Sequence, residues 1–101
     1  PKKWRYALGY PLISLVNELV NNITYANSIF PNNNENLELR KRYQTLAIAN
    51  CFQIQNSLIV MEQCVQTVKV EQMTEIIDKL SHEIALLKAW QKSNKIIKQD
   101  K

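Results

Sequence analysis

Histidine, cysteine and acidic side chains carry most enzyme and metal chemistry, and this sequence offers few of them in useful positions. His82 is the only histidine, and Asp78 precedes it by four residues, so one helix face could pair the two. A catalytic triad also needs a nucleophile aimed at the histidine, whereas the adjacent Ser81 would point to a different face. We therefore expect His82 to be a surface or capping residue and the protein not to be an enzyme.

The two cysteines do not form a plausible bridge or metal site. Cys51 and Cys64 are 13 residues apart in the sequence, which is about 20 Å along a helix at 1.5 Å per residue. They are too far apart to bond within a straight helix. Without a CxxC spacing or a second histidine, no zinc site is predicted and no cofactor is expected. Cys51 is interpreted as a small core residue, and a reducing, cytoplasmic location is favoured.

The positive charges are the more promising groups, because they are confined to patches. The chain has 13 Lys and Arg against 9 Asp and Glu, for a net charge of +4. No Lys or Arg occurs between Arg5 and Arg40, or between Arg42 and Lys69. Clustered cations bind phosphate backbones largely through counterion release. The candidate nucleic-acid or partner-binding residues are Arg40, Lys41, Arg42, Lys88, Lys92, Lys95 and Lys98. The alternative is a solvated surface, since lysines at a helix C-terminus also complement the helix dipole.

Long helices must position these groups, because the chain contains almost no residues that favour turns. One Gly and three Pro exclude a turn-rich β-sandwich and a glycine-rich nucleotide loop. Gly9 is expected to break any regular element, and residues 31–34 form a loop that ends in asparagines suited to capping a helix. We predict one all-α domain over residues 1–101, with helices at about 11–30, 36–68 and 71–95, and a turn near 67–70.

Apolar spacing predicts how these helices pack. Ala47, Cys51, Ile54, Leu58 and Met61 alternate steps of four and three, which is the pattern of a helix packed lengthwise on its neighbours. Short connections make neighbouring helices antiparallel, so residues 40–42 and 88–98 should share one end of an up-down bundle. Within the last helix, Lys88, Lys92 and Lys95 are expected on one face.

Several further side chains suggest contacts outside the three helices. Leu46, Phe52, Ile59 and Val60 fall outside the apolar seam, which indicates an additional neighbour. Eleven Asn and eight Gln suit a buried interface better than charged residues do, although an AT-rich genome would produce the same bias. Trp90 is interpreted as a core or interface anchor rather than as a platform for stacking a base.

Several segments resemble a known group of small helical bundles. They are Tyr10-Pro11-Leu12-Ile13, residues 26–31 (ANSIFP), Arg40-Lys41-Arg42-Tyr43-Gln44 followed by residues 47–51 (AIANC), and residues 83–93 (EIALLKAWQKS). Together they resemble the accessory variability determinant (Avd) proteins of diversity-generating retroelements, which are similar in turn to proteins encoded in ribosomal RNA intervening sequences. The resemblance covers most of residues 10–95.

This resemblance implies a function. Avd proteins are positively charged, barrel-like homopentamers of four-helix bundles that bind a reverse transcriptase and nucleic acid, and they support mutagenic copying of template RNA into cDNA during retrohoming. By resemblance, this chain is a non-catalytic, homo-oligomeric accessory protein that binds a reverse transcriptase and its RNA or cDNA. Three long helices are evident here instead of four: the fourth precedes Pro1, or the second helix breaks around Gln55–Ser57. The alternative function is a structural adaptor bundle that contacts only protein.

Overall fold

The computed structural model describes residues 9–64 and 70–97 of the chain. These residues form three long helices, α2 (Tyr10–Ser28), α3 (Asn34–Cys64) and α4 (Val70–Lys92). The predicted all-α class is confirmed, and the helix ends differ from the predicted ones by one to four residues. Helix α3 runs unbroken through residues 55–57, so the suggested break there is wrong. The turn predicted near 67–70 lies mostly outside the described residues.

Local signals explain where the helices begin. The side-chain Oδ1 of Asn33 accepts a hydrogen bond from the backbone N–H of Asn36 at 2.8 Å, which caps the start of α3 as the asparagine run predicted. Pro11 lies in the first turn of α2, where a missing N–H costs nothing. Gly9 precedes the first residue of α2 and adopts right-handed helical angles, φ −71° and ψ −49°. The break expected there concerns the residues before Gly9, which lie outside the described residues.

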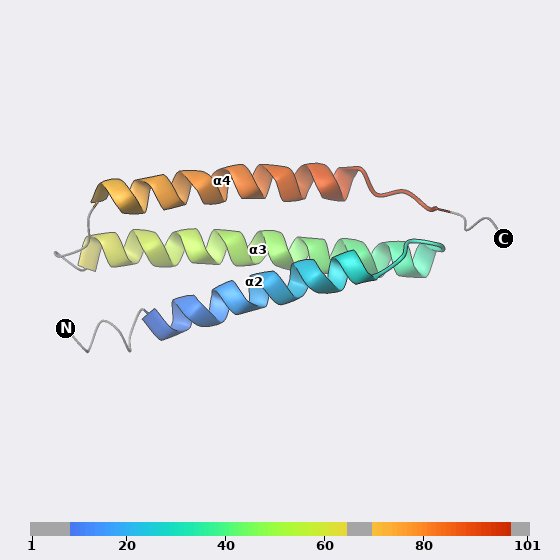
Figure 1. The fold of residues 1–101 in the computed structure, drawn as a ribbon, viewed down its shortest axis with the longest axis horizontal. Helices are drawn as coiled ribbons and strands as arrows, with labels where there is room; N and C mark the ends of the chain where they lie inside the picture. Colours follow the sequence, from blue (N-terminus) through green and yellow to red (C-terminus); the bar gives the residue numbers. More distant parts are fainter. Residues whose placement is uncertain (1–8, 65–69, 98–101) are drawn as a thin grey trace.

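Helix α3 lies between the other two helices, and successive helices run in opposite directions (Figure 1). One stripe along α3 contacts both neighbours. Ala47 and Cys51 are fully buried with Ile84 and Leu87 of α4, and Leu19 of α2 packs against the same group. A second cluster joins Ile54 and Leu58 to residues of α2 and α4 in the same way. The outcome is an elongated molecule with principal extents of 59 × 22 × 16 Å.

The predicted core stripes are confirmed for α3 and α4 but only partly for α2. Met73, Ile84 and Leu87 of α4 are buried, as are the seam residues of α3. In α2, Ala26 is the only residue that reaches full burial. Val16 and Phe30, which share the periodic spacing of the α2 core residues, are exposed. Helix α2 packs mainly on α3, so one side of its broad apolar stripe is left uncovered.

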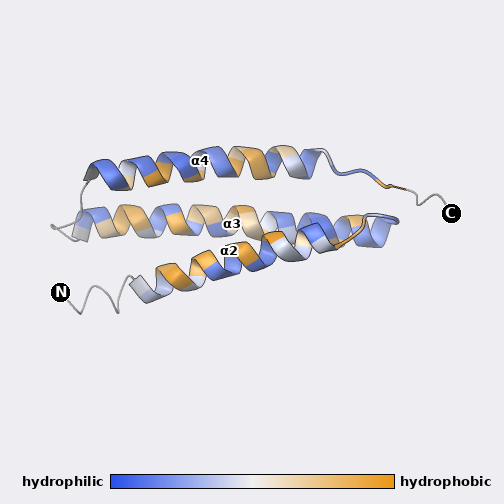
Figure 2. Cartoon of the chain, viewed as in Figure 1, coloured by the Kyte–Doolittle hydropathy of each residue, from blue (hydrophilic) through white to orange (hydrophobic). Residues whose placement is uncertain are grey.

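The uncovered apolar side chains are numerous for so small a molecule. Hydrophobic residues recur on successive turns of α2 (Figure 2). Ile13, Val16 and Val20 share one side of that helix by their spacing, and they are 57%, 43% and 56% exposed. Further exposed apolar side chains on α3 and α4 are Leu46, Phe52, Ile59, Val60, Ile76 and Leu86.

No helix of the described residues is long and apolar enough to cross a membrane.

Candidate functional site

The two basic groups of the sequence lie at one end of the molecule. Residues 40–42 belong to the first turns of α3, and Lys88 and Lys92 to the last turns of α4, which lie side by side (Figure 1). Gln91 joins the two segments directly. Its Nε2 donates to the backbone oxygen of Lys41 at 3.1 Å and to Oγ1 of Thr45 at 2.7 Å. The antiparallel order therefore brings the charges together as expected, and we call this region the basic end.

Arg40 belongs to the basic end but faces inward. Its Nη1 donates to the backbone oxygen of Ile29 at 3.1 Å, and its guanidinium lies 5.2 Å from the ring centroid of Trp90. Its Nε is buried and has no hydrogen-bond partner among the described residues. Arg40 thus connects the end of α2 to α4 from its position on α3. Its geometry is that of a residue that holds the helices together.

Trp90 is the second residue of this inward arrangement. It is half-buried and packs against the cluster that contains Ala47 and Leu87, and Arg40 lies over its ring. A half-buried ring that packs against the core is poorly placed to stack on a base. The position agrees with the interpretation of Trp90 as an anchor, within the core of this chain.

The remaining described cations of the candidate set are more accessible. Arg42, Lys88, Lys92 and Lys95 are exposed, and none of them pairs with an acidic side chain of residues 9–64 or 70–97. Lys41 is half-buried and lies 3.6 Å from the carboxylate of Glu38. The Nζ of Lys88 lies 5.5 Å from the ring centroid of Phe52. Lys98 lies outside the described residues.

The predicted stripe of Lys88, Lys92 and Lys95 on one helix face is wrong at its last position. Helix α4 ends at Lys92, where Ser93 Oγ donates to the backbone oxygen of Trp90 at 2.6 Å. The side-chain amides of Asn94 and buried Gln44 then donate to each other's oxygens. The chain continues without regular secondary structure, and the N–H of Ile97 donates to the backbone oxygen of Pro31 at 2.9 Å. Lys95 belongs to this non-helical segment.

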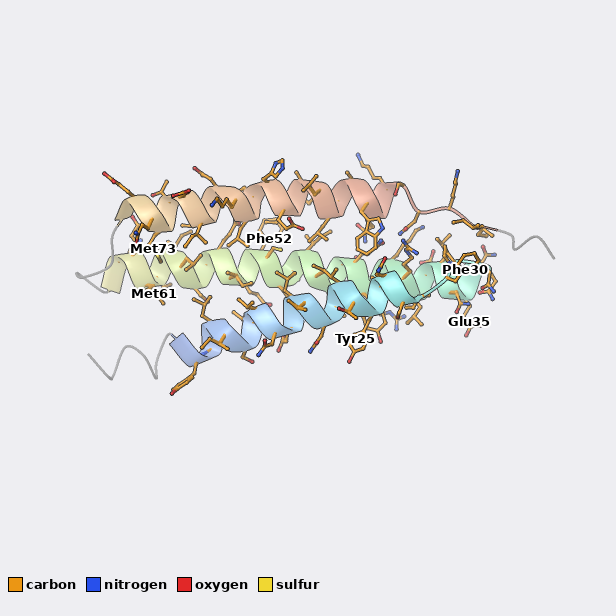
Figure 3. All side chains as sticks on the ribbon, in the orientation of Figure 1. Tyr25, Phe30, Glu35, Phe52, Met61 and Met73 are labelled. Atoms are coloured by element: carbon orange, nitrogen blue, oxygen red, sulfur yellow. The ribbon has the colours of Figure 1, made fainter. Side chains whose placement is uncertain are left out.

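Phe52 is the residue of this region that the sequence did not identify. It was expected only to contact an additional neighbour, whereas in the structure it lies beside Lys88 with 45% of its surface exposed. Figure 3 shows it extending from α3 toward α4. Phe52 follows Thr45 by seven residues, so the sequence already places both on one side of α3. Only the observed contact between α3 and α4 shows that this side faces α4.

The groups that could support catalysis do not converge. His82 and Asp78 are exposed, and no hydrogen bond or ion pair joins them in the described part of the chain. The hydroxyl of Ser81 accepts a hydrogen bond from Gln55 Nε2 at 2.8 Å. Burial raises the pKa of the Cys51 thiol, and the nearby carboxylate of Glu83 raises it further. A protonated, buried thiol is a poor nucleophile. No cluster of metal-binding side chains occurs in the described ranges.

Comparisons with protein-family models, with curated proteins and with solved structures find no match to this chain. The function must therefore be argued from the placement of the charged, aromatic and apolar side chains themselves. Of these, the basic end is the feature that carries several exposed cations, Arg42, Lys88 and Lys92, which form no ion pair within the described part of the chain.

Proposed function

We propose that this protein is a non-catalytic accessory factor that self-associates and holds RNA or cDNA close to a reverse transcriptase, as the resemblance to Avd proteins implies. The observation that supports the proposal is the basic end, where the early turns of α3 and the last turns of α4 lie side by side (Figure 1) and carry the exposed Arg42, Lys88 and Lys92. A phosphate backbone gains affinity from such a cluster by releasing condensed counterions. For the affinity for nucleic acid, the net charge of +4 matters less than the clustering of positive side chains at one end of the molecule.

The absence of opposing charge strengthens this assignment. Residues 39–61 of α3 and residues 84–97 at the end of the described chain contain no Asp or Glu. Glu38 is the acidic residue that neutralises part of this region, through its ion pair with Lys41. The local potential at the basic end is therefore positive, which favours and steers the approach of a polyanion. In a ring of subunits, this potential would repeat around one rim.

The second candidate function is an adaptor bundle that binds only protein. The observation that favours it is the uncovered apolar side of α2, which includes Ile13, Val16 and Val20. Contiguous exposed apolar surface marks protein-interaction sites. The two functions share this feature, because an accessory protein that self-associates would use it between subunits. The role of the basic end distinguishes the two functions, because a protein-only adaptor would not bind RNA there.

A salt titration of RNA binding tests the proposal. We expect binding at low salt whose affinity falls as salt rises, with a log–log slope of roughly 0.7 per contacted phosphate of a single strand. Replacing Lys88, Lys92 and Lys95 by Gln should reduce the slope by about two and weaken binding. The matched control is Lys79→Gln on the same helix, because Lys79 is exposed but pairs with Glu75 at 3.4 Å away from the basic end.

The outcomes separate the two functions. Absence of RNA binding at low salt, or affinity that does not respond to salt, would rule out the accessory function and leave the protein-only adaptor. An equal effect of Lys79→Gln and of the triple variant would show that general positive charge, and not the basic end, binds RNA. Circular dichroism of each variant checks that the helices are retained.

A further inference from the structure

We propose that the face where α3 and α4 meet binds single-stranded nucleic acid, with a base stacked on Phe52 and adjacent phosphates held by Lys88 and Lys92. This inference rests on the proposed function and deepens it, because it names the strand state of the ligand and an aromatic contact. The starting observation is that Lys88 Nζ lies 5.5 Å from the centroid of a ring that is 45% exposed.

The helix register places an aromatic and polar row beside a basic row. On α3, Lys41, Thr45 and Phe52 are spaced by four and seven residues and therefore lie on one side of the helix. On α4, Ser81, Lys88 and Lys92 are spaced by seven and four and share a side in the same way. Three contacts that involve members of these rows show that the two sides meet: Gln91 with Thr45, Lys88 with Phe52, and Gln55 with Ser81. We call this surface the α3–α4 face.

The dimensions of the α3–α4 face suit a strand rather than a single nucleotide. Lys41 and Phe52 are separated by 11 residues, which is about 16 Å along the helix axis at 1.5 Å per residue. Lys88 and Lys92 are about 6 Å apart along their axis by the same measure. A track of cations beside an exposed aromatic ring is the combination by which proteins hold unpaired strands, since the bases of a duplex are not free to stack on a side chain.

The other aromatic residues near the basic end do not offer this combination. Trp90 is half-buried against the core cluster, and Tyr43 lies against Tyr25 with ring centroids 5.3 Å apart. Phe30 is 42% exposed but belongs to the connection between α2 and α3, away from Phe52 (Figure 3). Phe52 is thus the ring that joins exposure to an adjacent exposed cation in the described residues.

Binding of the full chain to labelled oligouridylate and to an RNA duplex of equal length tests the proposal. We expect Phe52→Leu to weaken single-strand binding by about 5- to 150-fold, the equivalent of the roughly 1–3 kcal/mol that one stacked base contributes. Duplex binding should not change. Phe52→Trp should bind at least as tightly as the native protein, because the indole ring offers a larger stacking surface.

The matched control is Phe30→Leu, which removes an equally exposed phenylalanine and should leave both affinities unchanged. A 2-aminopurine placed in the oligonucleotide gives a direct reading, since stacking on Phe52 should quench its fluorescence in the native protein and not in Phe52→Leu. Melting curves should show that Phe52→Leu remains folded, because Phe52 belongs to neither of the two core clusters.

Each contrary outcome has a distinct meaning. If Phe52→Leu binds the single strand normally while Lys88→Gln weakens it, the stacking proposal is overturned and the electrostatic function stands. If the native protein binds neither RNA, both fall. If Phe52→Leu leaves RNA affinity intact but lowers the mass of the particle in light scattering, Phe52 belongs to a protein interface and the proposal is wrong.

Discussion

Asn50 shows how neutral amides are used inside this molecule. The residue is only 4% exposed, and its Oδ1 accepts a hydrogen bond from Asn22 Nδ2 at 2.7 Å. Its own Nδ2 donates to Glu18 at 3.1 Å and to Gln53 at 3.2 Å. These bonds join α2 to α3 through polar groups, and buried polar groups that are fully hydrogen-bonded fix a specific alignment of helices.

We predict that Asn50→Ala lowers the free energy of unfolding by about 1–3 kcal/mol, because the amide of Asn22 and the carboxylate of Glu18 lose a partner at a partly buried site. Urea denaturation followed by circular dichroism measures the change. Asn56→Ala is the control, since Asn56 is exposed on the same helix and should change stability by less than about 0.5 kcal/mol. Equal effects of the two substitutions would show that the amide cluster contributes nothing specific.

Arg40 connects all three helices, whereas Asn50 connects two. It is based on α3, bonds to the backbone just after α2 at Ile29, and lies over Trp90 of α4. A hydrogen bond from a charged donor and a cation–π contact each stabilise by roughly 1–2 kcal/mol when partly desolvated. One side chain therefore fixes how the ends of three helices meet, and it shapes the basic end without facing solvent as its neighbours do.

The contrast between Arg40 and Arg42 is testable. Arg40→Gln should lower the free energy of unfolding by about 1–3 kcal/mol, as measured by urea denaturation. Arg42→Gln should leave stability within about 0.5 kcal/mol of the native value, since Arg42 is exposed. For RNA affinity at low salt the order of the two variants should be the opposite, and Arg42→Gln should be the one that weakens binding. A loss of stability in Arg42→Gln with none in Arg40→Gln would contradict the assigned roles.

The arrangement of the helices was largely predictable, because each helix has a regular apolar repeat and the turn-forming residues are confined to a few places. Burial of Ala47, Cys51, Ile54 and Leu58 follows directly from their spacing. The end of α4 was not predictable in the same way. Lysine favours a helix, and only the pairing of Asn94 with distant Gln44 shows why the chain leaves the helix before Lys95.

The candidate site was predictable in its location but not in its orientation. Antiparallel helices place residues 40–42 beside residues 88–92 whatever their rotation. Which of those side chains face outward depends on how α3 is rotated against both neighbours, and that rotation is set by tertiary contacts such as Gln91 to Thr45. For this reason the sequence grouped Arg40 with the surface cations and did not connect Phe52 with Lys88.

At the scale of the whole molecule, the three helices leave apolar surface on the outside. The exposed side of α2 with Ile13, Val16 and Val20 continues the helix stripe that buries Leu19 and Ile23 against α3. A helix with such a broad stripe ordinarily packs on more than one neighbour. The self-association proposed above would cover this side with a second copy of the chain, which would remove the apolar area from water without requiring another protein.

We predict that the native protein scatters light as a multiple of its 11.8 kDa chain mass. Val16→Glu should shift the mass toward a single chain, because a carboxylate on the uncovered side of α2 cannot be buried without a large desolvation cost. Asn17→Glu, at the next position on the helix, is the matched control: its side chain points to a different side, so the mass should not change. A native mass of one chain would rule out self-association under those conditions, and loss of assembly in both variants would show that added negative charge, rather than the apolar side of α2, controls it.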